Sequence, residues 1–338
     1  MNIGILDADF LYRGTTMPNL ASMKLSAYHK QKGDHVELCR GADVLLYDKI
    51  YVSKVFTDTV IPDCLYLPKC IMGGTGFYME KAEPLPTEIE HTMPDYSLYD
   101  GLEDYKTYRD FSVGFLTRGC FRKCPFCVNK RFDKVLAWSE PSEFVDQKRK
   151  YIYLLDDNFL AFWSGWENLL DKLEATGKRF QFRQGLDLRI MTEKQAERLG
   201  KTRYYGDFIF AFDNIKDREI IERKLKQWRK FCSKNTKLYV LSAFFGQGID
   251  DIVSIFERIK ILFKYKCFPY VMRYKDYVCS KFKDLYIQIA RWANQPQFVK
   301  KLSFREYCEI EERSHRIFTQ FVDQFPILKD YAEMKFNF

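Results

Sequence analysis

The sequence has no long hydrophobic run. Among its 338 residues there is no stretch of about 18 consecutive apolar residues, the least that a helix needs to cross a lipid bilayer. The first ten residues, MNIGILDADF, have the pattern of a β-strand and lack the features of a secretory signal. These absences predict a cytoplasmic protein without a membrane partner.

Histidine and paired cysteines are also scarce. A zinc site usually shows two CxxC or Cys/His pairs, but this chain has only Cys124 with Cys127 and no histidine nearby. Without a secretory signal, the ten cysteines are expected to be reduced. Seven are scattered without pairing and are predicted to be buried thiols: Cys39, Cys64, Cys70, Cys232, Cys267, Cys279 and Cys308.

The chain has no strong charge of either sign. Lys and Arg number 54 against 46 Asp and Glu, a formal charge of +8. This mild excess could help to bind an anionic partner, yet an ordinary solvated surface of this length shows the same balance. Apolar residues make up 46% of the chain, which is ample for the core of two domains or one large α/β domain.

One stretch, residues 114–131, reads GFLTRGCFRKCPFCVNKR. Its cysteines Cys120, Cys124 and Cys127 are separated by three and then two residues, in a loop that follows a strand-like run. Thiolates at this spacing can converge on one metal cluster. A [4Fe-4S] cluster normally takes four thiolates, so three local cysteines leave one iron open for chemistry. Buried structural cysteines would have no reason to fall at this spacing.

Segment 117–127 resembles the cluster loop of the radical S-adenosylmethionine (radical SAM) superfamily. The resemblance implies that Cys120, Cys124 and Cys127 bind a [4Fe-4S] cluster whose open iron is chelated by S-adenosylmethionine (AdoMet). It also implies reductive cleavage of AdoMet to methionine and a 5′-deoxyadenosyl radical. Phe126 would lie against the adenine, and an external donor of the flavodoxin or ferredoxin type would supply the electron.

Residues 1–80 predict a small Rossmann-like βαβ domain with parallel strands. A helix is expected to begin at Pro18 and to end before Gly33. Short apolar strands are expected at residues 2–6, 35–38, 48–52 and 70–72.

This N-terminal half resembles the cobalamin-binding domain that precedes many radical SAM cores. The Asp-x-His-x-x-Gly motif that would supply a cobalt-ligating histidine is absent, because His29 and His35 fall on the predicted helix and strand. Cobalamin bound without a histidine ligand is left open. The glycine-rich turn 73–76 could approach a ligand closely, although a plain strand-ending loop explains it as well.

Residues 81–110 are expected to be a connector anchored by tyrosines, and residues 111–280 alternate strands with helices. Capping boxes predict helix starts at Ser164 and Thr192. Six β/α repeats, with the cysteine loop directly after the first strand, predict a partial (β/α)6 radical SAM barrel of parallel strands. The strands are expected at 112–117, 151–155, 179–183, 207–212, 237–243 and 267–272.

The carboxyl ends of these strands predict further site residues, because reacting groups gather there in such barrels. Asp156, Asp157 and Asn158 fall where the superfamily places its AdoMet-amine motif. Arg183 could form a bidentate contact with the AdoMet carboxylate. The remaining candidates, for ribose, adenosine or substrate, are Asp213 and Ser242.

Residues 281–338 are expected to form a helical C-terminal extension with an apolar stripe and a capping box at Ser303. Segments 224–237 and 264–283 interleave basic and aromatic residues. That pattern is compatible with RNA stacking and phosphate contact, but a solvated helix face explains it better.

Together these features predict a radical SAM enzyme that cleaves AdoMet at a [4Fe-4S] cluster to modify a substrate. No residue identifies this substrate as a nucleic acid, a peptide or a small molecule. A cobalamin-dependent radical SAM methyltransferase is the alternative reaction. A non-catalytic metal-cluster protein that binds nucleic acid is the alternative of another class, and it would produce no 5′-deoxyadenosine.

Overall fold

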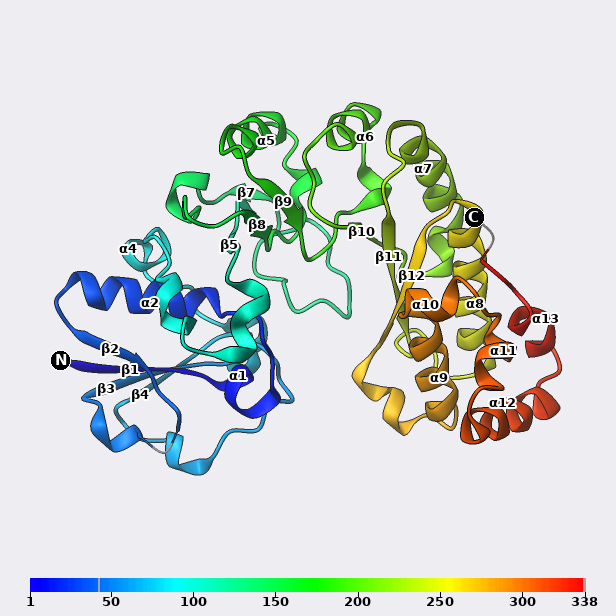
Figure 1. Cartoon of the computed structure of the whole chain (residues 1–338), viewed down its shortest axis with the longest axis horizontal. Helices are drawn as coiled ribbons and strands as arrows, with labels where there is room; N and C mark the ends of the chain where they lie inside the picture. The colour runs from blue at the N-terminus through cyan, green and yellow to red at the C-terminus, as the bar shows by residue number, and fades with distance from the viewer. Residues whose placement is uncertain (42, 337–338) are drawn as a thin grey trace. The chain divides into compact units, whose positions relative to one another are not determined.

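The computed structural model describes residues 1–41 and 43–336. It divides into two compact units, residues 1–183 and residues 184–338, and each is described by itself (Figure 1). The first unit contains two parallel sheets and a two-stranded antiparallel ribbon. The second contains one parallel sheet and most of the helices.

The first sheet is fully parallel with the strand order β2-β1-β3-β4, and α2 lies against it (Figure 1). This confirms the predicted N-terminal βαβ arrangement. The helix expected from Pro18 begins two residues later, because the side chain of Asn19 caps it by accepting from the N–H of Ser22. The elements are β1 (Asn2–Asp7), α1 (Ala8–Arg13), α2 (Leu20–Gln31), β2 (His35–Leu38), β3 (Lys49–Ser53) and β4 (Cys70–Gly73).

The connector, residues 81–110, packs against β1 and α2. It contains the short helix α4 (Thr87–Glu90), and α3 (Thr75–Tyr78) precedes it. Tyr96, Tyr99 and Tyr105 are buried, and the hydroxyl of Tyr99 donates to the carboxylate of Asp7 at 2.7 Å. The tyrosines therefore anchor the connector, as the sequence predicted.

The second sheet of the first unit has the parallel order β5-β8-β9, with strands β5 (Phe111–Gly114), β8 (Tyr151–Leu154) and β9 (Arg179–Phe182). The antiparallel ribbon of β6 (Thr117–Arg118) and β7 (Leu136–Ala137) follows β5, and α5 (Trp166–Ala175) follows β8. The predicted capping box at Ser164 is wrong, because the N-cap of α5 is Gly165 and no side chain caps this helix.

The second unit is built on the parallel sheet β10-β11-β12, with α8 and α9 beside its β12 edge (Figure 1). The capping boxes predicted at Thr192 and Ser303 are confirmed. The six predicted core strands thus form one three-stranded sheet in each unit, and their closure into a single partial barrel stays a prediction. The strands are β10 (Phe208–Ala211), β11 (Thr236–Ser242) and β12 (Phe268–Arg273).

The helices α9 to α13 confirm that the described part of residues 281–338 is largely helical, as predicted, and α6 to α8 precede them in the second unit. They are α6 (Glu193–Gly200), α7 (Arg218–Phe231), α8 (Ile249–Lys264), α9 (Lys283–Ala293), α10 (Pro296–Val299), α11 (Phe304–Cys308), α12 (Glu312–Gln324) and α13 (Leu328–Ala332).

Candidate metal-cluster and cofactor site

The cysteine loop spans residues 119–135, between the two strands of the antiparallel ribbon. Its three cysteines are half-buried, and a turn in which the N–H of Cys127 donates to the carbonyl of Cys124 at 3.0 Å brings the last two together. Burial raises the pKa of Cys127, the amide N–H of Asn129 opposes this rise, and the thiols of Cys124 and Cys120 add to it. The turn thus places Cys124 and Cys127 next to each other in the loop.

Hydrogen-bond donors are directed at the sulfurs of Cys120 and Cys127. The backbone N–H of Arg122 donates to Cys120 Sγ and that of Asn129 to Cys127 Sγ, both at 3.4 Å. Among residues 1–41 and 43–336, no three His, Cys, Asp or Glu side chains are placed to hold a single metal ion. Three thiols with N–H donors instead suit a cluster, in which each cysteine binds a different iron and hydrogen bonds to sulfur tune its potential.

Gly119 determines how the chain enters the loop. Its φ of +98° lies in the left-handed region, and an added Cβ would lie 2.3 Å from the carbonyl oxygen of Lys134 and 2.6 Å from Cβ of Phe132. Only glycine fits this position without moving the backbone. The Thr-Arg-Gly sequence before the first cysteine therefore has a steric reason.

Asp156 follows β8 and is buried against the start of the cysteine loop. Its carboxylate accepts from the N–H groups of Leu116 at 3.2 Å and Thr117 at 2.7 Å, and from the Thr117 hydroxyl at 2.6 Å. Burial raises the pKa of Asp156 to about 7, although these hydrogen bonds oppose the rise. The carboxylate thus holds the chain segment that leads into the loop.

Asp157 connects the start of the cysteine loop to Asn129, two residues after the last cysteine. One carboxylate oxygen accepts from the N–H of Gly119 at 2.7 Å, and the other accepts from the side-chain amide of Asn129 at 2.6 Å. The guanidinium of Arg118 is 4.0 Å away.

Asn158 is buried and turns its amide nitrogen toward the loop. Nδ2 donates to Cys120 Sγ at 3.3 Å, whereas Oδ1 has no hydrogen-bond partner within the described residues. A buried acceptor without a partner costs about 1–3 kcal/mol. The structure therefore brings all three predicted residues that follow β8 to the cysteine loop.

Two further predicted residues of the first unit lie close to these elements. Phe126 is half-buried inside the cysteine loop. Arg183 directly follows β9, its backbone N–H donates to the carbonyl of Leu154, and its guanidinium lies 4.8 Å from the ring centroid of Tyr153. Arg183 also donates to the side-chain oxygen of Gln181 at 3.2 Å.

The other two predicted residues, Asp213 and Ser242, belong to the second unit. Burial raises the pKa of Asp213 to about 6, while Arg189 and Arg258 oppose the rise. Ser242 is buried at the end of β11, and its hydroxyl donates to the carbonyl of Met272 at 3.1 Å. Both residues lie at strand ends of their own sheet, as predicted.

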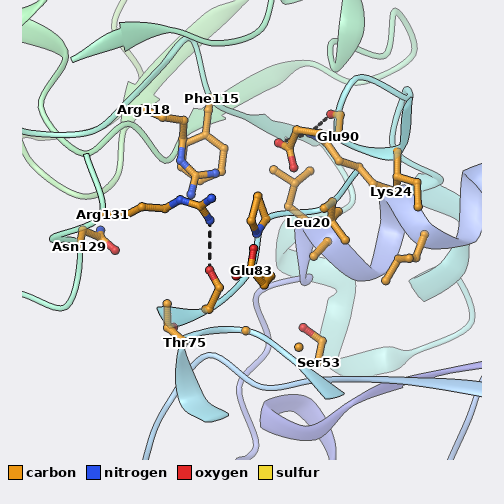
Figure 2. A pocket seen from close by; sticks show the side chains of 18 of the residues that line it. Leu20, Lys24, Ser53, Thr75, Glu83, Glu90, Phe115, Arg118, Asn129 and Arg131 are labelled. Atoms are coloured by element: carbon orange, nitrogen blue, oxygen red, sulfur yellow. Dashed lines mark hydrogen bonds and ion pairs between the residues drawn. The ribbon is translucent and has the colours of Figure 1, made fainter. Parts of the chain in front are cut away.

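A cavity of about 490 Å³ lies in the first unit, between the carboxyl ends of β3 and β4, the connector and the cysteine loop (Figure 2). Leu20 and Lys24 lie on one side of it, and Phe115, Arg118 and Arg131 on the other (Figure 2). Its lining also includes Gly73, Gly74, Thr75, Asn129, Trp138 and Asp157. The glycine-rich turn therefore forms part of a cavity wall.

The cavity wall contains a buried ion pair. Lys24 Nζ lies 2.8 Å from Glu90 Oε1, and the indole N–H of Trp138 donates to the same oxygen at 2.9 Å. On the opposite wall, the Arg118 guanidinium lies 4.1 Å from the ring centroid of Phe115, and its Nε makes no hydrogen bond within the described residues. No local motif marks Asn129 or this ion pair, and the motif that contains Arg118 gives its side chain no role of its own.

The two N-terminal histidines are engaged elsewhere. His29 lies on α2 with Nδ1 2.7 Å from Asp34 and Nε2 3.0 Å from the hydroxyl of Tyr51, and His35 on β2 pairs with Glu37. Within the described residues, no histidine lines the cavity. The described residues that line the cavity therefore offer a ligand no imidazole. No helix in the described ranges has both the length and the apolarity to cross a bilayer.

The sequence matches no protein-family model and no curated protein. The structure is similar to that of the radical S-adenosylmethionine methyltransferase TsrM from Kitasatospora setae with cobalamin and a [4Fe-4S] cluster bound. This match has a TM-score of 0.55 and 12% identity and covers 80% of this chain and 74% of TsrM. A second TsrM structure, with tryptophan substrate and the SAM analogue aza-SAM, matches with a TM-score of 0.53 and 12% identity over 77% of this chain and 71% of TsrM. The resemblance in the sequence is thus confirmed at the level of the fold.

Proposed function

We propose that this protein is a radical SAM enzyme that binds a [4Fe-4S] cluster through Cys120, Cys124 and Cys127. The observation that carries the proposal is the donor set of the loop: three thiols spaced by three and two residues, with N–H groups directed at Cys120 and Cys127. Neutral N–H donors stabilise thiolates and the sulfur of a cluster, so the residues fit this group. When bound, the cluster would supply one electron for the reductive cleavage of AdoMet.

The other site residues have proposed roles around AdoMet. Phe126 would lie against the adenine, and Arg183 would bind the AdoMet carboxylate as a cation. Asp213 and Ser242 stay candidates for ribose, adenosine or substrate contact. The expected role of Asp156 and Asp157 in binding the AdoMet amine stays a prediction, and both carboxylates already accept hydrogen bonds from the protein. A flavodoxin-type or ferredoxin-type donor would reduce the cluster.

The test is an anaerobic assay with iron, sulfide, dithionite and AdoMet, read as 5′-deoxyadenosine by mass spectrometry. We expect product from the wild type, none from Cys124→Ala, and product from Cys64→Ala, a matched control at an exposed cysteine outside the loop. No product despite a bound [4Fe-4S] cluster would contradict the proposed AdoMet cleavage. It would favour a non-catalytic cluster protein, whose nucleic-acid affinity would then be measured.

A second candidate is cobalamin-dependent methyl transfer, supported by the cavity at the carboxyl ends of β3 and β4. Ligands of parallel α/β sheets bind at this edge, and the cavity also reaches the cysteine loop. TsrM, which is similar in fold, has been solved with cobalamin bound. Because no histidine in the described part of the chain lines the cavity, cobalamin would bind here without a histidine ligand to cobalt.

Hydroxocobalamin retained after gel filtration, measured by its visible absorption, tests this candidate. Gly73→Leu should abolish retention, because Gly73 lines the cavity and a Cβ there meets open space, so the larger side chain fills it without a backbone clash. Gly101→Leu is the matched control, since a Cβ at Gly101 also meets open space and Gly101 does not line the cavity. Equal retention by both variants would contradict the assignment of cobalamin to this cavity.

A further inference from the structure

We propose that Asp157 and Asn129 form a clasp that holds the cysteine loop in the conformation that receives the cluster, and that Asn158 orients the first cysteine sulfur. The inference rests on the proposed cluster function and deepens it. The three residues are positioning residues. Asp157 and Asn129 hold the loop and Asn158 contacts Cys120, and none of the three is proposed as a cluster ligand.

The clasp joins both ends of the metal-binding segment through one carboxylate. Asp157 accepts from the N–H of Gly119, the residue before Cys120, and from the side chain of Asn129, two residues after Cys127. Each contact spans more than 25 residues of sequence, with separations of 38 and 28. The segment that follows β8 therefore restrains the chain on both sides of the three cysteines, which lowers the conformational entropy that cluster binding would otherwise remove.

The exposure of Asn129 separates the clasp from the folding core. Asn129 is exposed, whereas Asp157 is largely buried beside it. A substitution at Asn129 therefore changes the clasp without opening a cavity in the core. This makes Asn129 the residue at which the clasp can be broken with the least effect on folding.

Asn158 has a different role, because its side-chain amide directs an N–H at the sulfur of Cys120. Its amide places Nδ2 on Cys120 Sγ while Oδ1 stays buried without a partner among the described residues. The unsatisfied oxygen is explained if the amide is held in this orientation to present its N–H to sulfur. A donor to a cluster thiolate favours the reduced, more negative state of the cluster.

The test of the clasp is a reciprocal exchange of its two side chains. Asn129→Asp places two carboxylates opposite each other, and the double variant Asn129→Asp/Asp157→Asn restores a carboxylate–amide pair and an acceptor for the N–H of Gly119. After anaerobic reconstitution, the rate of iron release to a chelator is measured for each. We expect about 10–100-fold faster release in Asn129→Asp, and recovery in the double variant. Asn235→Asp, at an exposed asparagine of the second unit, is the matched control and should not change the rate.

Hydrogen exchange of the metal-free proteins gives a second readout. Amides of residues 119–129 should lose protection in Asn129→Asp and regain it in the double variant. Unchanged iron release and exchange in Asn129→Asp, or no recovery in the double variant, would overturn the clasp. If the wild type binds no iron, the proposed cluster function fails, whereas the exchange data still decide whether the clasp exists.

Asn158→Leu tests the orientation of the donor, because leucine is similar in size and lacks the N–H. We expect a cluster of normal iron content with a lower midpoint potential in a redox titration followed by electron paramagnetic resonance. A purely structural role for Asn158 would leave the potential unchanged. An unchanged potential in a fully loaded variant would therefore overturn this part of the proposal.

Discussion

Two buried carboxylates of the first unit have different kinds of partner. On the cavity wall, Glu90 meets the ammonium of Lys24 and the indole N–H of Trp138. After the end of β8, the hydrogen bonds to Asp156 within the described residues come from neutral donors, the N–H groups of Leu116 and Thr117 and the Thr117 hydroxyl. Neutral donors offset burial only in part, and the pKa of Asp156 rises to about 7.

The kind of partner decides whether a region is sensitive to substitution or to pH. A buried ion pair depends on both partners, since loss of one leaves an uncompensated charge. A carboxylate held by neutral donors can instead take up a proton. The cavity wall should therefore be sensitive to substitution, and the chain segment that leads into the cysteine loop should be sensitive to pH.

The largest expected effect is on the cavity wall. Glu90→Ala should lower the free energy of unfolding by about 3–5 kcal/mol, because the buried Lys24 ammonium loses the carboxylate that compensates its charge and keeps only the backbone carbonyl of residue 90 as a partner within the described residues. Chemical denaturation of the metal-free protein measures this value. The double variant Lys24→Met/Glu90→Leu is the control and should lie close to the wild type. A loss below about 1 kcal/mol in Glu90→Ala would show that the pair behaves as an exposed salt bridge.

The second prediction concerns pH and Asp156. The folded-state pKa of about 7 lies above the ordinary value of 3.8, so between these values only the folded protein holds this proton. The contribution to stability is therefore complete below pH 4 and is lost as the pH rises to about 7, by up to about 4 kcal/mol. Asp156→Asn should remove this slope in denaturation curves measured from pH 4 to pH 8. Parallel curves for the two proteins would contradict it.

The smallest effect is expected at Trp138, where one neutral donor supports the ion pair. Trp138→Phe removes the hydrogen bond to Glu90 and should cost about 1 kcal/mol, because Lys24 still compensates the carboxylate. Thermal unfolding of the metal-free protein measures it. A loss as large as that of Glu90→Ala would mean that the indole, and not the ammonium, chiefly stabilises Glu90.

Local patterns in the sequence predicted the elements whose signals lie within a few residues. The strands β2 and β8 were predicted to within one residue, and the capping boxes at Thr192 and Ser303 were correct. The box at Ser164 failed although its sequence fits, because the chain reaches α5 with Gly165 at the N-cap. A local motif thus predicts a contact only when the surrounding chain leaves its backbone in the required conformation.

The sequence by itself determined the spacing of Cys120, Cys124 and Cys127, because metal-ligand spacing is a property of neighbouring residues. It also placed Asp156, Asp157 and Asn158 at a strand end. Only the tertiary structure decided what these residues contact, since Asn129 and Gly119 reach Asp157 across 28 and 38 residues of sequence. The ion pair on the cavity wall could not be predicted from the sequence either. Lys24 and Glu90 lie 66 residues apart and meet only when the connector packs onto the first sheet.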